Sequence, residues 1–412
     1  MKSDLDTLMK QYALDAIMII GPGQHNPPMV YLTGGGHLTN AILIKKRGEE
    51  AVLFYNPMER DEAARSGLKT KNLADYNFND LLNQAGGDTL KATVKRYLLM
   101  LAEQGISSGR LALYGRTEIG ANYAIFSALQ QELPKISLVG EVDNSALMLA
   151  RMTKDDQEVE RIRKMGKITT QVVGQVSDFI TSHTARNGVL EKKNGEPLTI
   201  GHVKQRIDLW LSEHGAENPE GTIFSIGRDA GVPHSSGNPG QPLKLGQTII
   251  FDIYPCEAGG GYFYDFTRTW CLGFAPDEVQ ALYQTVSNAY TKVVGQLEVG
   301  KPFKHYQNLI CDMFSAHGHP TIKEDPKTQL GYVHSLGHGI GLNVHERPWS
   351  GITSDDKDYL LPGTVFTIEP GLYYPDKGMG VRIEDSFWTR PDGKIELLAD
   401  YPRDLILPIK SR

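Results

Sequence analysis

Four acidic residues in the second half of the chain lie within apolar or aromatic segments that are typical of strands: Asp252, Asp265, Glu369 and Glu384. Because such a strand faces a core on at least one side, we expect the four carboxylates to be buried. A buried carboxylate without a cation is strongly destabilising. Only Arg268 and Arg382 are near them in sequence, so a metal cluster would neutralise four acids better than side chains alone.

An internal repeat contains two of these acids. Segment 245–252 (LGQTIIFD) matches segment 362–369 (PGTVFTIE), and in each an acid follows a turn glycine by six residues. A second acid comes 13 residues after Asp252 and 15 residues after Glu369. The repeat predicts two β-hairpins related by a pseudo-two-fold axis, each delivering two carboxylates to one centre. Chance similarity of two short strands is the alternative.

Three histidines fall within twelve residues: His334, His338 and His345. A lone histidine is usually a packed or surface residue, but three among glycines favour a site that needs close backbone approach. The spacing of four between the first two is that of a zincin helix. No glutamate follows His334 and glycines crowd the segment, so that interpretation is disfavoured.

Four carboxylates and one imidazole make an oxygen-rich ligand set. Such a set suits two divalent metal ions, most simply manganese, with cobalt or zinc as alternatives. Two ions that share a water lower its pKa, so we expect a metal-bridging hydroxide as the nucleophile. The sequence offers no Gly-x-Ser-x-Gly motif and no cysteine in a catalytic pattern, so no other nucleophile is indicated.

The elements that must position these residues form two domains. In the first third we expect a strand at 16–20, hairpin strands at 41–44 and 51–55, a helix at 89–103 and a strand at 110–114, which together indicate a small α/β domain. A long amphipathic helix follows, with apolar residues every three or four positions from 159 to 180. We place the boundary just before it, giving domains 1–152 and 153–412.

Composition narrows the function classes. The net charge is −6 and the pI is about 6.1, so no basic surface is indicated and we expect neither nucleic acid nor a membrane as a partner. Three cysteines cannot form a disulfide framework, and the N-terminus lacks the apolar run of a signal peptide. These features predict a cytoplasmic protein.

Four motifs in combination resemble a known family: Asp-Phe-Thr-Arg-Thr from Asp265, His-Ser-Leu-Gly-His-Gly-Ile-Gly-Leu from His334, Glu-Pro-Gly from Glu369 and Val-Arg-Ile-Glu-Asp from Val381. With them the chain resembles the pita-bread metallopeptidases, which include prolidase, aminopeptidase P and, more distantly, methionine aminopeptidase. The resemblance covers residue 155 to the end. It implies an α/β plus α+β protein, in which a small creatinase-type N-terminal α/β domain precedes a pita-bread catalytic domain.

The resemblance also implies the metal ligands. Asp252 would bind one ion, Asp265 and Glu384 would bridge both ions, and His338 and Glu369 would bind the second.

The remaining roles follow from the same resemblance. Glu369 would also carry a proton from the attacking water towards the leaving nitrogen. His345 would donate a hydrogen bond to the scissile carbonyl or its oxyanion. His234 would be a further substrate-contacting histidine, with a surface turn residue as the alternative. His334 would line the pocket for proline, and Arg382 would hold a ligand carboxylate from behind.

The implied activity is hydrolysis of peptide bonds near the N-terminus, at Xaa-Pro bonds, as an aminopeptidase P or a prolidase that forms a homodimer. The chain departs from the family pattern at Tyr264 and Asn343 and in the residues after Asp252. No ligand is lost, but these positions lie at the rim of the site and bear on the substrate. A pita-bread enzyme that acts as a lyase or hydrolase on a small metabolite is therefore the alternative.

Overall fold

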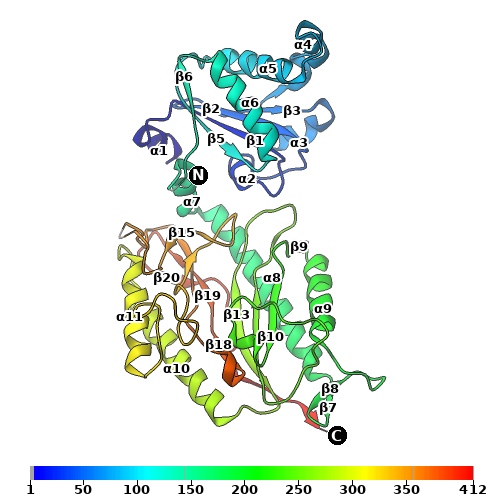
Figure 1. Cartoon of the computed structure of the whole chain (residues 1–412), viewed down its shortest axis with the longest axis vertical. Helices are drawn as coiled ribbons and strands as arrows, with labels where there is room; N and C mark the ends of the chain where they lie inside the picture. Colours follow the sequence, from blue (N-terminus) through cyan, green and yellow to red (C-terminus); the bar gives the residue numbers. More distant parts are fainter. Residues whose placement is uncertain (1–3, 143, 356, 412) are drawn as a thin grey trace. The chain divides into compact units, whose positions relative to one another are not determined.

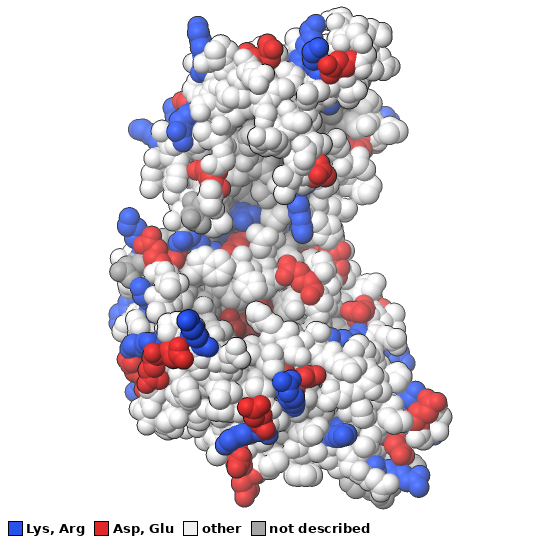
Figure 2. Space-filling model, viewed as in Figure 1, with Lys and Arg blue, Asp and Glu red and all other residues white. Residues whose placement is uncertain are grey.

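The computed structural model describes residues 4–142, 144–355 and 357–411. The chain divides into two compact units. Unit 1 comprises Met1–Arg151 with Gly259–Gly261, and unit 2 comprises Met152–Ala258 with Tyr262–Arg412. Among the described residues, every helix is too short or too polar to cross a bilayer. On the face drawn in Figure 2, basic and acidic side chains are interspersed.

Unit 1 is built on a six-stranded mixed sheet with the order β4-β3-β2-β1-β5-β6. Its strands are β1 (Ala16–Gly21), β2 (Ala41–Lys46), β3 (Val52–Tyr55), β4 (Lys69–Asn72), β5 (Gly109–Gly115) and β6 (Ile136–Val139). Its helices are α1 (Leu5–Gln11), α2 (Pro27–Thr33), α3 (Arg60–Arg65), α4 (Phe78–Gln84), α5 (Thr89–Glu103), α6 (Ile119–Glu132) and α7 (Ala146–Met152), the last ending at the first residue of unit 2.

The local patterns of unit 1 explain this arrangement. Every residue of β1 is buried, as a continuous apolar run in a central strand requires. The strands predicted at 41–44 and 51–55 are β2 and β3, which pair antiparallel, and the predicted helix at 89–103 is α5. Apolar residues of α5 and α6 pack with those of β1 and β2 in one core (Figure 1). The α/β prediction for this segment is confirmed.

Unit 2 contains two larger sheets, β10-β11-β13-β21 and β15-β14-β16-β19-β20, and the ribbon β17-β18. The strands that matter for the site are β10 (Thr222–Ile226), β11 (Thr248–Ile253), β13 (Phe266–Leu272), β14 (His338–Gly339), β15 (Glu346–Trp349), β16 (Val365–Ile368), β17 (Gly371–Tyr374), β18 (Met379–Arg382) and β19 (Asp385–Thr389). The remaining strands are β7 (Thr184–Arg186), β8 (Val189–Glu191), β9 (Ala216–Glu217), β12 (Cys256–Glu257), β20 (Ile395–Leu397), β21 (Ile406–Leu407) and β22 (Lys410–Ser411).

Four helices flank these sheets: α8 (Asp156–Thr181), α9 (Ile200–Glu213), α10 (Asp277–Val294) and α11 (Phe303–Ala316). In Figure 1, α8 and α9 lie on one side of unit 2 and α10 and α11 on the other. The long amphipathic helix is α8, which begins with a capping box between Asp155 and Glu158. At Gly166 an added Cβ would come within 2.6 Å of the Tyr264 ring, so a glycine is needed for α8 to pack beside the segment that carries Asp265.

The internal repeat appears as two matched hairpins. In the first, β11 pairs antiparallel with β13, and in the second, β16 pairs antiparallel with β19. The turn glycines Gly246 and Gly363 have φ of +71° and +88°. The Gly246 N–H donates to the last carbonyl of β13 (3.0 Å), and the Gly363 N–H donates to the last carbonyl of β19 (2.7 Å). The two glycines therefore close equivalent turns, as the repeat predicted.

Candidate metal centre

The hairpins deliver the four acids from equivalent places. Asp252 lies in β11, opposite Thr267 of β13. Asp265 directly precedes β13, and Glu369 directly follows β16. Glu384 lies between β18 and β19, where its N–H donates to the Thr267 carbonyl (3.1 Å). This hydrogen bond joins the two hairpins at the point where the carboxylates meet.

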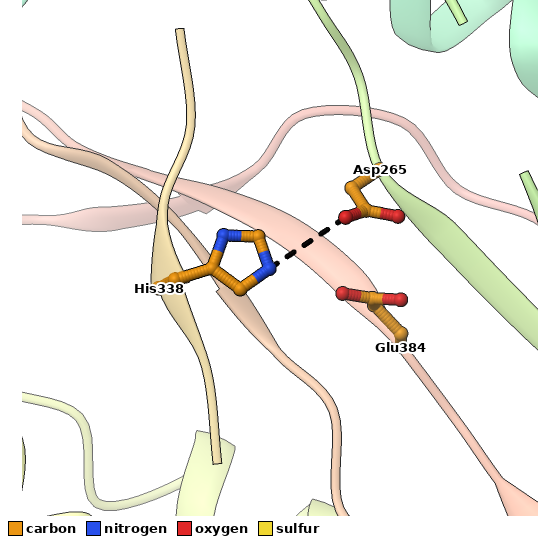
Figure 3. A group of neighbouring side chains, drawn as sticks. All are labelled: Asp265, His338 and Glu384. Carbon is orange, nitrogen blue, oxygen red and sulfur yellow. Dashed lines mark ion pairs between the residues drawn. The ribbon is translucent and has the colours of Figure 1, made fainter. Parts of the chain in front are cut away.

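A tight group forms around His338. Asp265, His338 and Glu384 are buried, and each offers a ligand atom within 4.8 Å of the others. Figure 3 shows the imidazole directed towards the two carboxylates. Its Nε2 lies 3.6 Å from Asp265 Oδ2 and 3.5 Å from Glu369 Oε1. These distances are too long for hydrogen bonds and leave space for an ion between the atoms.

The protonation state of His338 is the one expected of a metal ligand. Its Nδ1 lies 3.0 Å from the Gly339 carbonyl oxygen, which can only accept, so Nδ1 carries the proton. Burial, together with neighbouring His345, lowers the pKa of His338 to about 3. The ring is therefore neutral at pH 7, and the Nε2 lone pair faces carboxylate oxygens. A cation between them converts this repulsion into coordination.

The carboxyl groups of the cluster also have pKa values that their surroundings shift. Burial and the Asp252 charge raise the pKa of Glu384 to about 8. Burial and the Glu384 charge raise the pKa of Asp265 and of Glu369 well above the ordinary range. Like charges crowded in a desolvated site disfavour ionisation, and a bound cation reverses that preference.

The hydrogen bonding of the carboxylate oxygens indicates whether a metal ion fits this site. Asp252 Oδ1, Asp265 Oδ1 and Glu384 Oε1 are buried and have no hydrogen-bond partner among the described residues. Buried oxygens are nearly always satisfied in folded proteins. The donor set also suits a divalent ion, because it consists of carboxylate oxygens and one neutral imidazole nitrogen. The residues therefore fit a metal centre.

One arginine reaches the cluster. Arg382 Nη2 pairs with Asp252 Oδ2 (2.6 Å), and Arg382 Nη1 donates to the Tyr373 hydroxyl (2.8 Å). His334 Nε2 lies 2.7 Å from the same hydroxyl, and His334 Nδ1 lies 2.7 Å from the Ser335 carbonyl oxygen. The chain His334–Tyr373–Arg382–Asp252 thus fixes one carboxylate of the cluster.

This chain of hydrogen bonds limits what His334 can do. Burial and the Arg382 charge lower the pKa of His334 to about 3, so the ring is neutral. Nδ1 donates to the carbonyl and Nε2 accepts from Tyr373, so both nitrogens are engaged by the protein. His334 can therefore offer a substrate its ring face and edge but not a free hydrogen-bonding atom. Sequence reasoning missed Tyr373, whose position in an apolar strand gives no local signal.

His345 and His234 differ from His334. Neither side chain makes a hydrogen bond with a described residue, so their nitrogens are available to a substrate. The ring centroid of His345 lies 4.3 Å from that of His338 and 6.3 Å from that of Trp349. His234 is exposed, in the segment that follows β10.

A cavity of about 700 Å³ in unit 2 brings these residues together. It is lined by every site residue predicted from the sequence: His234, Asp252, Asp265, His334, His338, His345, Glu369, Arg382 and Glu384. Sequence reasoning did not identify three further lining residues with charged or aromatic side chains: Lys204, Glu220 and Trp349. All three lie outside the repeat and the histidine motif, so no local pattern marks them as site residues.

Several known proteins are similar to this chain in sequence. An uncharacterized peptidase of Methanocaldococcus jannaschii is 32% identical over 246 residues, which cover 59% of this chain and 62% of that protein. A Xaa-Pro dipeptidase of Pyrococcus horikoshii is 24% identical over 401 residues, 97% of this chain and 96% of the relative. The matches at 32% identity thus span less than two thirds of the length of those relatives.

The solved structure of the prolidase from Pyrococcus furiosus aligns with a TM-score of 0.70 at 21% identity, covering 97% of this chain and 100% of that one. The predicted pita-bread fold with its creatinase-type N-terminal domain is confirmed by this likeness. Residues 160–391, more than half of the chain, match the model of metallopeptidase family M24. The chain belongs to metallopeptidase family M24.

Proposed function

We propose that this protein hydrolyses Xaa-Pro peptide bonds at the N-termini of peptides with the help of two divalent ions, most simply Mn²⁺. One observation carries the proposal: the neutral Nε2 of His338 and several unsatisfied buried carboxylate oxygens converge on one cavity. The name of the Pyrococcus horikoshii relative, Xaa-Pro dipeptidase, supports the choice of substrate.

Five residues would hold the ions: Asp252, Asp265, His338, Glu369 and Glu384. Divalent ions at this position supply Lewis acidity, which polarises a carbonyl group and makes a water molecule acidic at neutral pH. A carboxylate-rich set with one imidazole suits manganese, and cobalt or zinc would also be accommodated.

The chain's own side chains would perform the proton transfers. The Glu369 carboxylate is partly exposed to the cavity, so it can take a proton from the attacking water and deliver it to the leaving proline nitrogen. His345 has free ring nitrogens at the cavity wall, so it can donate a hydrogen bond to the oxyanion. Ile223, Val344 and Trp349 line the same cavity and offer apolar surface to a proline ring.

The test is release of amino acid from Gly-Pro and Gly-Pro-Pro peptides with Mn²⁺ added, after the metal content of the purified protein has been measured. We expect cleavage that a chelator removes and Mn²⁺ restores. A Glu278→Gln variant, which changes an exposed acid remote from the cavity, serves as the control and should retain full activity. Two bound metals without cleavage of either peptide would contradict the proposed substrate and would favour a small-metabolite substrate.

A further inference from the structure

The charges that line the cavity are unevenly placed. Asp252, Asp265, Glu369 and Glu384 form one acidic group, and Glu220 is a fifth lining acid. Arg382 and Lys204 are the only lining lysine or arginine residues among the part of the chain that the structure describes. Any anionic group of a substrate must therefore use one of these two cations, a bound metal ion or a neutral donor.

Arg382 is already committed to the protein. It is 2% exposed, pairs with Asp252 and donates to the Tyr373 hydroxyl. Its Nε also donates to the Thr267 hydroxyl (3.3 Å), and its Nη1 lies 3.4 Å from the Pro233 carbonyl oxygen. A substrate anion could reach this guanidinium only by displacing such partners.

Lys204 is not committed in this way. It lies in α9, and its Nζ donates one hydrogen bond, to the Ser236 carbonyl (2.6 Å). It makes no ion pair with a described residue, and Asp208, four residues on in the helix, attracts it only from a distance. An ammonium group has three N–H donors, so two remain for a ligand. Lys204 is partly buried, which lowers the pKa of its ammonium group, and such a charge would gain from a nearby anion.

The position of Lys204 relates it to the substrate. The carbonyl that it binds is that of Ser236, two residues after His234, and both of these residues line the cavity. A dipeptide is a zwitterion with an ammonium group at one end and a carboxylate at the other. Lys204 offers a charge complementary to the carboxylate end.

We infer that Lys204 binds the free C-terminal carboxylate of a dipeptide, so that the site selects Xaa-Pro dipeptides over longer peptides. This inference rests on the proposed function and decides between its two forms, a prolidase and an aminopeptidase P. A longer peptide has a neutral amide in place of that carboxylate, so it cannot form the ion pair in which both donor and acceptor are charged.

The experiment compares Gly-Pro with Gly-Pro amide, which lacks the carboxylate, in the Mn²⁺-supplemented full-length protein. We expect Lys204→Met to raise KM for Gly-Pro by about 10- to 100-fold, the loss typical of a charge-assisted hydrogen bond, with kcat nearly unchanged. KM for the amide should not change. Lys204→Arg should restore most of the preference for Gly-Pro. The matched control is Lys244→Met, which removes an exposed lysine that does not line the cavity.

Two results would overturn the inference alone: an equal loss on both substrates in Lys204→Met, which indicates a structural role, or no change on Gly-Pro. Metal content and thermal unfolding of the variant should match the wild type, which separates these results from misfolding. If the wild-type protein cleaves neither compound, the proposed function fails and the inference fails with it.

Discussion

Two consecutive acids, Glu384 and Asp385, are equally buried but have opposite surroundings. Each is 2% exposed. Asp385 Oδ1 pairs with Arg268 Nη2 (2.8 Å), and Asp385 Oδ2 accepts from the Tyr290 hydroxyl (2.5 Å). Glu384 Oε2 accepts from the Thr267 hydroxyl (2.8 Å), while Glu384 Oε1 has no partner among the described residues.

The comparison shows that burial alone does not identify a metal ligand. Arg268 is itself held by main-chain carbonyls, including those of Thr267 and Glu384, so the pair with Asp385 is complete within the protein. Such a network is structural. A buried carboxylate oxygen that the fold leaves unsatisfied is where a ligand is expected.

The largest effect is expected from Glu384→Gln, which removes a carboxylate from the unsatisfied group. Because the ion loses a charged ligand, kcat/KM on Gly-Pro should fall at least about a thousandfold, or ~4 kcal/mol. Metal analysis after dialysis should show loss of bound Mn²⁺. The metal-free variant should fold as well as the metal-free wild type. If Glu384→Gln kept its activity and its full metal content, Glu384 would be no more a metal ligand than Asp385.

The neighbouring change, Asp385→Asn, should act on stability instead. It leaves the buried Arg268 charge uncompensated, so the free energy of unfolding should fall by about 3–5 kcal/mol in urea titrations. The folded fraction should still bind metal, since Asp385 faces away from the cluster. A loss below about 1 kcal/mol would show that the pair is not a structural ion pair of the kind described.

His345, whose ring packs against that of His338, extends the comparison. His345 has free nitrogens, so His345→Ala should lower kcat by about 10²- to 10³-fold, as for other oxyanion donors, while metal content holds. His317→Ala, an exposed histidine bonded to the Met313 carbonyl, is the matched control and should leave kcat unchanged. Metal loss in His345→Ala would identify this residue as a ligand rather than a substrate contact.

A smaller effect, on the stability of the metal-free protein, is expected from a change of pH. In the metal-free protein the pKa values of Asp265, Glu369 and Glu384 are raised, the last to about 8, whereas the unfolded chain releases these protons near pH 4 to 4.5. The folded state therefore holds more protons between about pH 4.5 and 8, so stability is full below this window and is lost as pH rises through it.

The Tm of the metal-free protein should accordingly fall between about pH 5 and 8, and the stabilisation by Mn²⁺ should grow over the same range. Glu384→Gln should show a shallower fall, which separates this contribution from that of other titrating groups. Equal slopes in the two proteins would argue against a protonated Glu384.

Much of the cluster could be predicted from the sequence because its signals are local. The two turn glycines, the apolar runs and the acids at fixed spacing define each hairpin without tertiary information. The partner of Arg268 could not be predicted in this way. Strand register places Thr267 opposite Asp252 and Arg268 opposite Phe251, so alternation turns the arginine away from the cluster.

Other parts of the cavity wall could not be predicted from the sequence. Lys204 comes from α9 and Glu220 from the segment before β10, and neither belongs to a motif. Tyr373 in β17 meets Arg382 through the local pairing of β17 with β18, but it meets His334 only where the histidine segment packs against this ribbon. Contacts of this kind depend on long-range packing rather than on local periodicity.

The most direct test is the number of Mn²⁺ ions that the wild-type protein holds after saturation and dialysis, measured by elemental analysis against protein concentration. Two ions per chain in the wild type, with fewer in Glu384→Gln, is the expected result. One ion or none in the folded wild-type protein would contradict a dinuclear centre built from Asp252, Asp265, His338, Glu369 and Glu384.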